Sequence, residues 1–337
     1  MTRQPALSIR RRGPFKVLFA HHREHEAHHV VVLMVLAAAL SLIATILVAG
    51  AAGYVSVASH LRHANWYWIP FAMAGAVAAH VGYTFAYREV AHVGRGVKLS
   101  ALRAGAIVSA GFGMFIPRGG FAVDIEALED LGVPRDEARV RVLGLGSLEY
   151  AVLATGALIC AIFLLLNHAH AQRGVTLSWL IGVPLGTALA LVAARYRKWI
   201  CRGWLKGILG PPLEAIAVVG QIVASPRRHG ASAFSGMALY WAGEVFVLWV
   251  CLAAFTRTTP SVAAVVVGYA TGYALTRRTL PLAGAGAVEA LLPFALSWCG
   301  ISLAAAVLAV FAYRVFNLWL PIVPAAIGLR SLRADTA

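Results

Sequence analysis

The sequence predicts an all-α integral membrane protein of about eight transmembrane helices plus one re-entrant segment. Of its 337 residues, 60% are hydrophobic and only 13% are charged, and the mean hydropathy is +0.75. A soluble domain of this length does not need so much apolar surface, whereas each helix that crosses a bilayer needs about 20 consecutive apolar residues. The apolar residues fall into long runs separated by basic loops, as in a chain that crosses the membrane many times.

Eight apolar runs approach the length that crosses about 30 Å of hydrocarbon. Gly, Ala and Ser are frequent in these runs, as close packing between helices in lipid requires. Trp66, Tyr67 and Trp68 open the second run, where a belt of aromatic side chains at the membrane interface is expected. The predicted spans are 30–52, 65–87, 145–167, 177–194, 233–255, 262–280, 283–299 and 302–328, of which 283–299 is the shortest.

The formal net charge of +15 is carried mainly by the loops between the apolar runs. On a soluble protein this charge would suggest a nucleic-acid partner, but no RNP, zinc-finger or helix-turn-helix signature accompanies it. In a membrane protein it favours anionic lipid headgroups and sets the orientation. Loops 53–64, 168–176 and 256–261 each hold a single Arg and no Lys, so we expect both termini and the more basic loops on the cytoplasmic side.

The apolar stretch 104–116 is too short for a span and lies between two basic loops, 88–103 and 117–143. It contains three glycines and leads into Pro117-Arg118-Gly119-Gly120. We therefore expect it to enter the membrane and return on the same side, because irregular backbone at membrane depth is tolerated only inside protein or beside a polar cavity. The alternative is a full span followed by an acidic outer loop.

The parts of the chain that resemble soluble protein are short. Residues 1–29 form a basic, His-rich segment and residues 329–337 form a tail, both expected in the cytoplasm. Residues 121–143 mix acids and arginines around Gly132-Val133-Pro134, a pattern that predicts a cytoplasmic helical hairpin on the membrane surface. Residues 30–328 form the transmembrane domain.

No cofactor is expected. His21, His25 and His29 would share one face of a helix and could bind a transition metal, and His25 and His29 are the histidines of an HExxH match, but they lie at the edge of the membrane. The preferred interpretation is a juxtamembrane helix that gains charge in acid, with no metal. No two cysteines form a CxxC pair, so neither a disulfide framework nor a zinc site is indicated. The cysteines are Cys160, Cys201, Cys251 and Cys299.

Four ionisable residues lie inside or at the ends of predicted spans: Glu149, Glu244, Glu289 and Arg314. A charge at membrane depth costs a few kcal/mol or more and is tolerated mainly beside a partner or a water-filled cavity. Arg314 is always charged, and the nearest acid in sequence is Glu289 on the preceding span. Either the two form a buried pair that fixes helix register, or Arg314 contacts the phosphate of a ligand.

The segment from Pro281 to Glu289 enters a helix through small residues, including Gly284 and Gly286. Free amides at a helix N-terminus favour an anion, and glycines let a headgroup approach the backbone. Arg277 and Arg278 lie just before this segment. Pro117-Arg118-Gly119-Gly120 has a similar composition, and one broken element in each half of a membrane protein often indicates a binding site.

Several catalytic signatures are absent from the sequence. GxSxG, the P-loop and an aspartate-rich diphosphate–metal motif do not occur, and the HExxH match His25-Glu26-Ala27-His28-His29 lies in the basic N-terminal segment. We therefore do not expect an enzyme, and ATP-driven pumping by this chain alone is excluded as far as motifs can exclude it. Any transport would run downhill or couple to protons or to the membrane potential.

Two passages carry a family resemblance. The first runs from Pro117-Arg118-Gly119-Gly120 through Gly132-Val133 to Ala138. The second runs from Pro281 through Gly284, Gly286 and Glu289 to Gly300-Ile301, Tyr313-Arg314 and Leu320-Pro321. Together they resemble the transmembrane region of lysylphosphatidylglycerol synthases, also called the flippase-like family. One departure is that the family's proline-glycine-glycine appears here as Pro281-Leu282-Ala283-Gly284.

The resemblance implies the membrane half of such proteins, which is associated with moving lipids between leaflets in a bacterial-type cell membrane. Bifunctional synthases of the family add a cytosolic aminoacyl-transferase domain. This chain ends at Ala337 without one, so aminoacylation is not expected. The residues that match the family's polar positions are Arg118, Glu289 and Arg314.

These observations predict that the protein binds a phospholipid, anionic or aminoacylated, or another polar-headed lipid and moves it across the bilayer. Two alternatives stay open: a membrane-embedded lipid-modifying transferase, and a non-transporting partner of a separate lipid-modifying enzyme. Assembly into a homo-oligomer is also open. The predicted headgroup-binding residues are Arg118, Arg277, Arg278, Glu289 and Arg314. The predicted cavity or coupling residues are Glu149, Glu244, Gly119, Gly284 and Gly286.

Overall fold

The computed structural model describes residues 23–93, 96–113, 120–167, 171–200, 205–224, 227–273 and 281–334, and these residues are helical apart from short connections. The predicted all-α membrane class is confirmed, and the protein is a multi-pass membrane protein. Within the described residues, 6 stretches are long and apolar enough to cross a membrane. They are His29–Ala52, Trp66–His92, Arg135–Leu166, Arg173–Arg195, Gly230–Phe255 and Leu303–Gly328.

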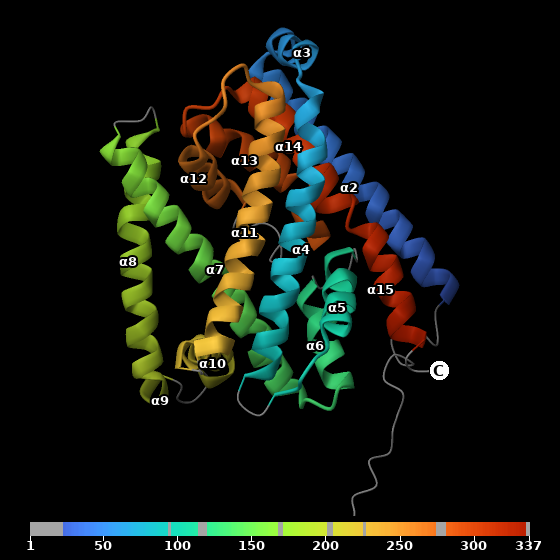
Figure 1. Cartoon of the computed structure of the whole chain (residues 1–337), viewed down its shortest axis with the longest axis vertical. Helices are drawn as coiled ribbons and strands as arrows, with labels where there is room; N and C mark the ends of the chain where they lie inside the picture. Colours follow the sequence, from blue (N-terminus) through green and yellow to red (C-terminus); the bar gives the residue numbers. More distant parts are fainter. Residues whose placement is uncertain are drawn as a thin grey trace, which may run out of the picture.

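The helices follow the chain in the order shown in Figure 1. Helices α4 and α11 cross the middle, α7 and α8 lie on one side of them, and α2 and α15 lie on the other (Figure 1). The elements are α2 (Arg23–Ala52), α3 (Tyr54–Arg62), η1 (Trp66–Trp68), α4 (Ile69–His92), α5 (Ala101–Gly113), α6 (Gly120–Asp130), α7 (Arg135–Leu166), α8 (Arg173–Arg195), α9 (Arg197–Ile200), α10 (Leu205–Ala224), α11 (Arg227–Phe255), α12 (Val262–Tyr273), η2 (Pro281–Gly284), α13 (Ala287–Trp298), α14 (Leu303–Arg314), η3 (Val315–Trp319) and α15 (Ile322–Ala334).

Two short helices stand where the sequence predicted spans 262–280 and 283–299. Helices α12 and α13 each have 12 residues, so each is about 18 Å long and cannot cross the hydrocarbon alone. Gly268 and Gly272 of α12 face Leu296 and Leu292 of α13, so the two helices run antiparallel. They form a hairpin that enters the protein and returns to the same end.

A second hairpin is built from α5 and α6. Arg103 near the start of α5 lies close enough to Asp130 at the end of α6 to lower its pKa. The start of α5 and the end of α6 therefore lie at the same end of the protein. Helix α6 also packs against α7 and buries Val123, Ala127 and Leu128. The stretch predicted as a surface hairpin, 121–143, therefore divides: α6 pairs with α5 inside the protein, and residues 135–143 begin the long helix α7.

Glycines bring α4 and α11 into backbone contact. A Cβ atom added to Gly82 would lie 2.5 Å from the amide nitrogen of Tyr240, and one added to Gly243 would lie 2.6 Å from the carbonyl oxygen of Gly75. Gly236 in turn faces Gly82. The first glycine of α4 therefore meets the last glycine of α11, which shows that the two helices are antiparallel. Small residues form their interface.

The two halves of the chain repeat one arrangement in opposite orientations. A long helix is followed by a short helical hairpin, a glycine turn and another long helical stretch, first in α4–α7 and then from α11 to the stretch Leu303–Gly328. Gly75 lies as many residues before Gly236 as Gly82 lies before Gly243. The same number of residues separates Ala101, where α5 begins, from Val262, where α12 begins. Because α4 and α11 are antiparallel, the hairpins that follow them enter from opposite ends. Inverted repeats of this kind are common in transporters.

Arg141 of α7 fastens the C-terminus of α4. Its guanidinium donates hydrogen bonds to the carbonyl oxygens of Val90, Ala91 and Val93 at 3.3, 3.1 and 2.8 Å, and it pairs with Glu137 at 2.6 Å. The last carbonyls of a helix have no partner within the helix, so this contact satisfies groups that are otherwise exposed at the helix end. It joins α7 to the end of α4.

The contact between α4 and α11 makes a prediction about stability. The substitution Gly82→Ala places a methyl group against backbone atoms of α11 that cannot move aside, so we expect a loss of about 1–3 kcal/mol in the free energy of unfolding. Denaturation in detergent measures it. Gly182→Ala in α8, where nothing lies within 4 Å, is the control and should not destabilise. Equal stability of the two variants would contradict the proposed packing.

A second prediction concerns the acids at the end of α6. Burial, together with the charges of Glu126 and Glu129, raises the pKa of Asp130 to about 6, and Arg103 opposes this rise. A raised folded-state pKa means that the ionised form costs stability above about pH 6, and that this cost disappears as the pH falls toward the ordinary value of 3.8.

We therefore expect Asp130→Asn to raise the unfolding temperature at pH 7.5, and the gain to shrink at pH 4.5. Asp136→Asn on the exposed first turn of α7 removes the same charge and is the control. It should give no gain. A gain for Asp130→Asn that does not depend on pH would rule out this cause.

Candidate functional site

A buried ion pair joins the α12–α13 hairpin to α14. Arg314, the last residue of α14, and Glu289, in the first turn of α13, are 1% and 2% exposed. The Nε atom of Arg314 donates to Oε1 of Glu289 at 2.8 Å. The other carboxylate oxygen accepts the amide hydrogen of Gly286 at 2.8 Å, so Glu289 also caps its own helix.

The same arginine holds the irregular segment before α13. Leu282 and Ala283 adopt left-handed conformations, with φ of 55° and 50°, and Gly284 and Gly286 have φ of 68° and 84°. A left-handed conformation costs a residue with a side chain about 1–2 kcal/mol, so the surroundings must hold it. Nη2 of Arg314 donates to the carbonyl oxygen of Ala283 at 3.1 Å and supplies that hold.

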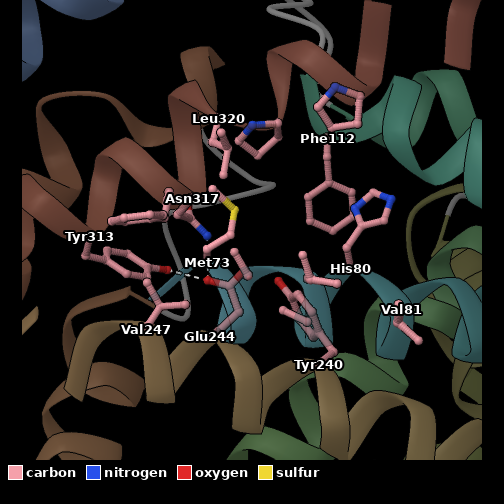
Figure 2. Close-up of a pocket in the computed structure, with 16 residues that line it drawn as sticks. Met73, His80, Val81, Phe112, Tyr240, Glu244, Val247, Tyr313, Asn317 and Leu320 are labelled. Carbon is pink, nitrogen blue, oxygen red and sulfur yellow. Dashed lines mark hydrogen bonds between the residues drawn. The ribbon is translucent and has the colours of Figure 1, made fainter. Parts of the chain in front are cut away.

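A second buried carboxylate, Glu244, lies on α11 and is 6% exposed. Three neutral donors converge on its Oε2 atom: the hydroxyl of Tyr313 at 2.6 Å, the hydroxyl of Tyr269 at 3.4 Å, and the side-chain amide of Asn317. Figure 2 shows Tyr313 and Asn317 turned toward Glu244. Such donors stabilise the carboxylate inside the protein.

Asn317 connects the two carboxylates. Its Oδ1 atom accepts from the hydroxyl of Tyr273 at 2.8 Å and lies 3.5 Å from Nη1 of Arg314. The residue sits in the π-helical segment η3, where Leu320 donates to Val315 five residues earlier. Wider turns of this kind are frequent at functional sites. The result is a continuous polar chain from Glu289 through Arg314 and Asn317 to Glu244.

A pocket of about 200 Å³ opens beside this chain, between α4, α11 and the α14–α15 segment. Glu244, Asn317 and Tyr313 form its polar side, and His80 lies across from them (Figure 2). The Nε2 atom of His80 is 2.9 Å from the hydroxyl of Ser109 on α5. The other lining residues are mainly apolar: Met73, Ala76, Val77, Ala79, Val81, Phe112, Tyr240, Val247, Phe316, Leu320, Pro321 and Pro324.

The structure distributes the predicted site residues unevenly. Glu244 lines the pocket, whereas Glu289 and Arg314 lie behind Asn317 and contact each other. Gly284 and Gly286 form the turn at Glu289. Glu149 is buried on α7, where its backbone carbonyl accepts from the indole of Trp241 at 2.7 Å, and it does not line this pocket. Four predicted residues lie outside the described residues: Arg118, Gly119, Arg277 and Arg278.

The metal hypothesis concerns the N-terminal histidines. His21 lies outside the described residues, and only the backbone of His25 is described. Within the parts of the chain that the structure describes, no group of three metal-ligating side chains occurs.

Sequence analysis missed five residues of the network and pocket, namely His80, Tyr269, Tyr273, Tyr313 and Asn317. A signal for four of them exists. Tyr269 and Tyr273 are four residues apart in an apolar run, and so are Tyr313 and Asn317. Polar side chains at this spacing share one helix face, so each pair marked a polar stripe on an otherwise apolar helix.

The buried pair predicts a strong asymmetry between single and double substitutions. Glu289→Leu alone leaves a buried guanidinium without its counter-charge, so we expect a loss of about 3–5 kcal/mol in the free energy of unfolding. Adding Arg314→Met should recover much of this loss, since two apolar groups then fill the site. The exposed pair Arg135–Glu129 is the control, and Arg135→Met should cost about 1 kcal/mol or less. Additive losses at Glu289 and Arg314 would contradict the pairing.

Comparison with known proteins adds one match. The family model described as the lysylphosphatidylglycerol synthase TM region matches residues 32–325, which is most of the chain. No curated protein matches the sequence.

Proposed function

The chain belongs to the lysylphosphatidylglycerol synthase TM-region family, and we propose that it binds a polar-headed lipid and moves it between the leaflets of a membrane. The main support is the polar chain from Glu289 to Glu244, which lies inside membrane-spanning helices and reaches a pocket with apolar walls. Buried charges at membrane depth are costly, and they are characteristic of substrate pathways.

The charges of this chain match a headgroup that carries both signs. Glu244 supplies negative charge at the pocket wall and attracts an ammonium group. Asn317 contacts Glu244 on one side and Arg314 on the other, and Arg314 supplies a guanidinium that suits a phosphate. An aminoacylated phospholipid such as lysylphosphatidylglycerol contains both an ammonium and a phosphate. We therefore propose a lipid of this class, whose acyl chains stay against the apolar walls and the surrounding bilayer.

Movement of the headgroup requires the pocket to grow, because about 200 Å³ is smaller than a typical ligand site of about 300–1,000 Å³. The inverted repeat supplies two elements that suit this role. The α5–α6 and α12–α13 hairpins enter from opposite ends, and alternating access in such folds consists largely of rocking one repeat against the other. The arginines Arg118, Arg277 and Arg278 belong in sequence to the breaks of these hairpins, where they would hold the phosphate.

The orientation is also part of the proposal. The described helices include 6 long apolar stretches, and an even number of spans supports both ends of the region on one side. The basic loops support a cytoplasmic location for that side, which we propose to be in a bacterial-type cell. We propose no chemical step for the protein. In the experiment below, a lipid-modifying transferase would produce a chemically altered lipid. A non-transporting partner of such an enzyme would produce no lipid movement.

The test is reconstitution in liposomes with labelled lipids on one leaflet. Glu244→Gln keeps the shape of the side chain but removes its charge, so we expect the movement of an ammonium-bearing aminoacylated lipid to fall about tenfold, the equivalent of one charge-assisted hydrogen bond. Movement of phosphatidylglycerol, which lacks the ammonium, should fall less. Glu289→Gln and Arg314→Ala should slow both lipids.

Glu214→Gln, at an exposed acid on α10, is the matched control and should leave both rates unchanged. Each variant is first checked for its unfolding temperature, so that misfolding is not mistaken for loss of function. Equal rates for the wild type, Glu244→Gln, Glu289→Gln and Arg314→Ala would overturn the assigned site.

A further inference from the structure

A second and larger pocket lies at the end of the molecule opposite to the basic loops. Its volume is about 690 Å³, and it lies at the mouth of the α12–α13 hairpin, beneath α3. Five segments meet there: the end of α3, residue 164 of α7, the loop 255–261, the start of α12 and the turn 299–302. Because the pocket for Glu244 is lined by different residues, the two are separate sites.

Among the described residues that line this pocket, every ionisable side chain apart from Cys299 is a base. His60 and His63 come from the end of α3, and Arg257 comes from the loop between α11 and α12. Hydroxyl groups complete the polar lining, from Ser59, Thr256, Thr258, Thr259, Ser261 and Ser302. A pocket with cations and hydroxyl donors, and without a carboxylate among its lining residues, is suited to an anion.

The sequence segments around the pocket contain no acidic residue that could pair with these basic side chains. The chain has 14 acidic residues, and none of them falls between Glu26 and Glu89, between Glu149 and Glu214, or between Glu244 and Glu289. None follows Glu289 before Asp335 either. The segments that form this end lie inside those intervals. Arg62 and Arg173 at the same end add further positive charge, so the local field there is positive over more than one pocket wall.

The two imidazoles are held in a defined orientation. Nδ1 of His60 is 2.8 Å from the carbonyl oxygen of Ser56, and Nδ1 of His63 is 2.8 Å from that of Ser59. A carbonyl oxygen only accepts hydrogen bonds, so Nδ1 is the donor in both rings and Nε2 is the other ring nitrogen. These contacts therefore leave Nε2 to serve a ligand.

Helix ends of both kinds meet at this pocket. Helices α12 and α14, of 12 residues each, both begin at this pocket, after Ser261 and Ser302. Ser302 makes no side-chain hydrogen bond to the first turn of α14. The first amides of a helix carry partial positive charge, whereas the ends of α3, α11 and α13, which also line the pocket, carry partial negative charge, so the attraction for an anion comes from the three basic side chains.

We propose that this pocket binds a phosphate group, either on a water-soluble phosphate ester or on the headgroup of an anionic phospholipid. The volume exceeds what one phosphate needs and leaves room for an attached glycerol or sugar. Arg257 makes charge-assisted hydrogen bonds to the phosphate oxygens, the two imidazoles add charge, and the serine and threonine hydroxyls contact the remaining polar atoms. The proposal does not rest on lipid movement through the Glu244 pocket.

The test measures binding to the purified full chain in two forms. In the first, glycerol 3-phosphate is titrated into the protein in neutral detergent by calorimetry at fixed ionic strength. In the second, the protein is placed in nanodiscs of phosphatidylcholine with or without phosphatidylglycerol, and protection of His60 and His63 from diethyl pyrocarbonate is followed. Saturable binding in the first form assigns a soluble phosphate ester. Protection only by phosphatidylglycerol assigns a lipid headgroup.

The variants separate a built site from general surface charge. Arg257→Gln, and the double variant His60→Gln with His63→Gln, should each weaken glycerol 3-phosphate binding about tenfold if the ligand is soluble. If the ligand is a lipid headgroup, Arg257→Gln should abolish the protection by phosphatidylglycerol. Arg173→Gln removes one charge from the same end without touching the pocket and should change neither measurement.

Two results would overturn the proposal: no saturable binding and no protection in either form, or an equal loss with Arg173→Gln. All of these substitutions lie at the exposed end, so an unchanged unfolding temperature is expected. Lipid movement measured on the same variants keeps this site distinct from the Glu244 pocket, because Glu244→Gln should leave glycerol 3-phosphate binding intact.

Discussion

A guanidinium and a carboxylate inside a membrane domain must satisfy each other, and the contact between Arg314 and Glu289 does so. Arg314 pairs with Glu289 and at the same time holds the carbonyl of Ala283, while Glu289 caps α13 through the amide of Gly286. One ion pair therefore fixes three things: the left-handed turn, the start of α13 and the position of α14. Without it, the α12–α13 hairpin would have a buried charge and an unsupported break.

The same pair determines how far the polar region extends. Because α14 passes into the π-helical segment η3 directly after Arg314, Asn317 is close enough to contact both the guanidinium and Glu244. The polar chain thus runs from the α12–α13 hairpin to the central helix α11. It ends at a pocket between α4 and α11, the two helices whose glycines allow the closest backbone approach. Tight packing and a polar site are therefore built from the same helices.

The two pockets differ in the sign of their charge. The pocket at Glu244 presents a carboxylate within apolar walls, whereas the pocket at Arg257 presents three basic side chains and several hydroxyls near the surface. A lipid whose headgroup carries an ammonium and a phosphate offers a partner for each. The inverted repeat places one hairpin at each end of the molecule. The pocket at Arg257 lies at the mouth of the α12–α13 hairpin, and the pocket at Glu244 lies between the central helices α4 and α11.

The sequence by itself determined the class of the protein, because 60% hydrophobic residues in long runs have no stable alternative to a membrane environment. It also determined that Glu244, Glu289 and Arg314 required an explanation, since a charge at membrane depth is costly wherever it points. The break at Pro281–Gly286 was visible from proline and glycine, and Pro117-Arg118-Gly119-Gly120, of which only Gly120 is among the described residues, has a similar composition. The family match agrees with the resemblance that these passages carry.

The tertiary structure alone decided which of these groups meet. Runs 262–280 and 283–299 are apolar enough for two spans, and only the antiparallel contact of Gly268 and Gly272 with α13 makes them one hairpin. The pairing of Glu289 with Arg314 left open by the sequence became definite. Asn317 and the tyrosines acquired their role through a π-helical turn that has no distinct sequence pattern. Hydropathy reports the depth of a side chain, whereas its partners depend on helix rotation and crossing, which packing between distant segments sets.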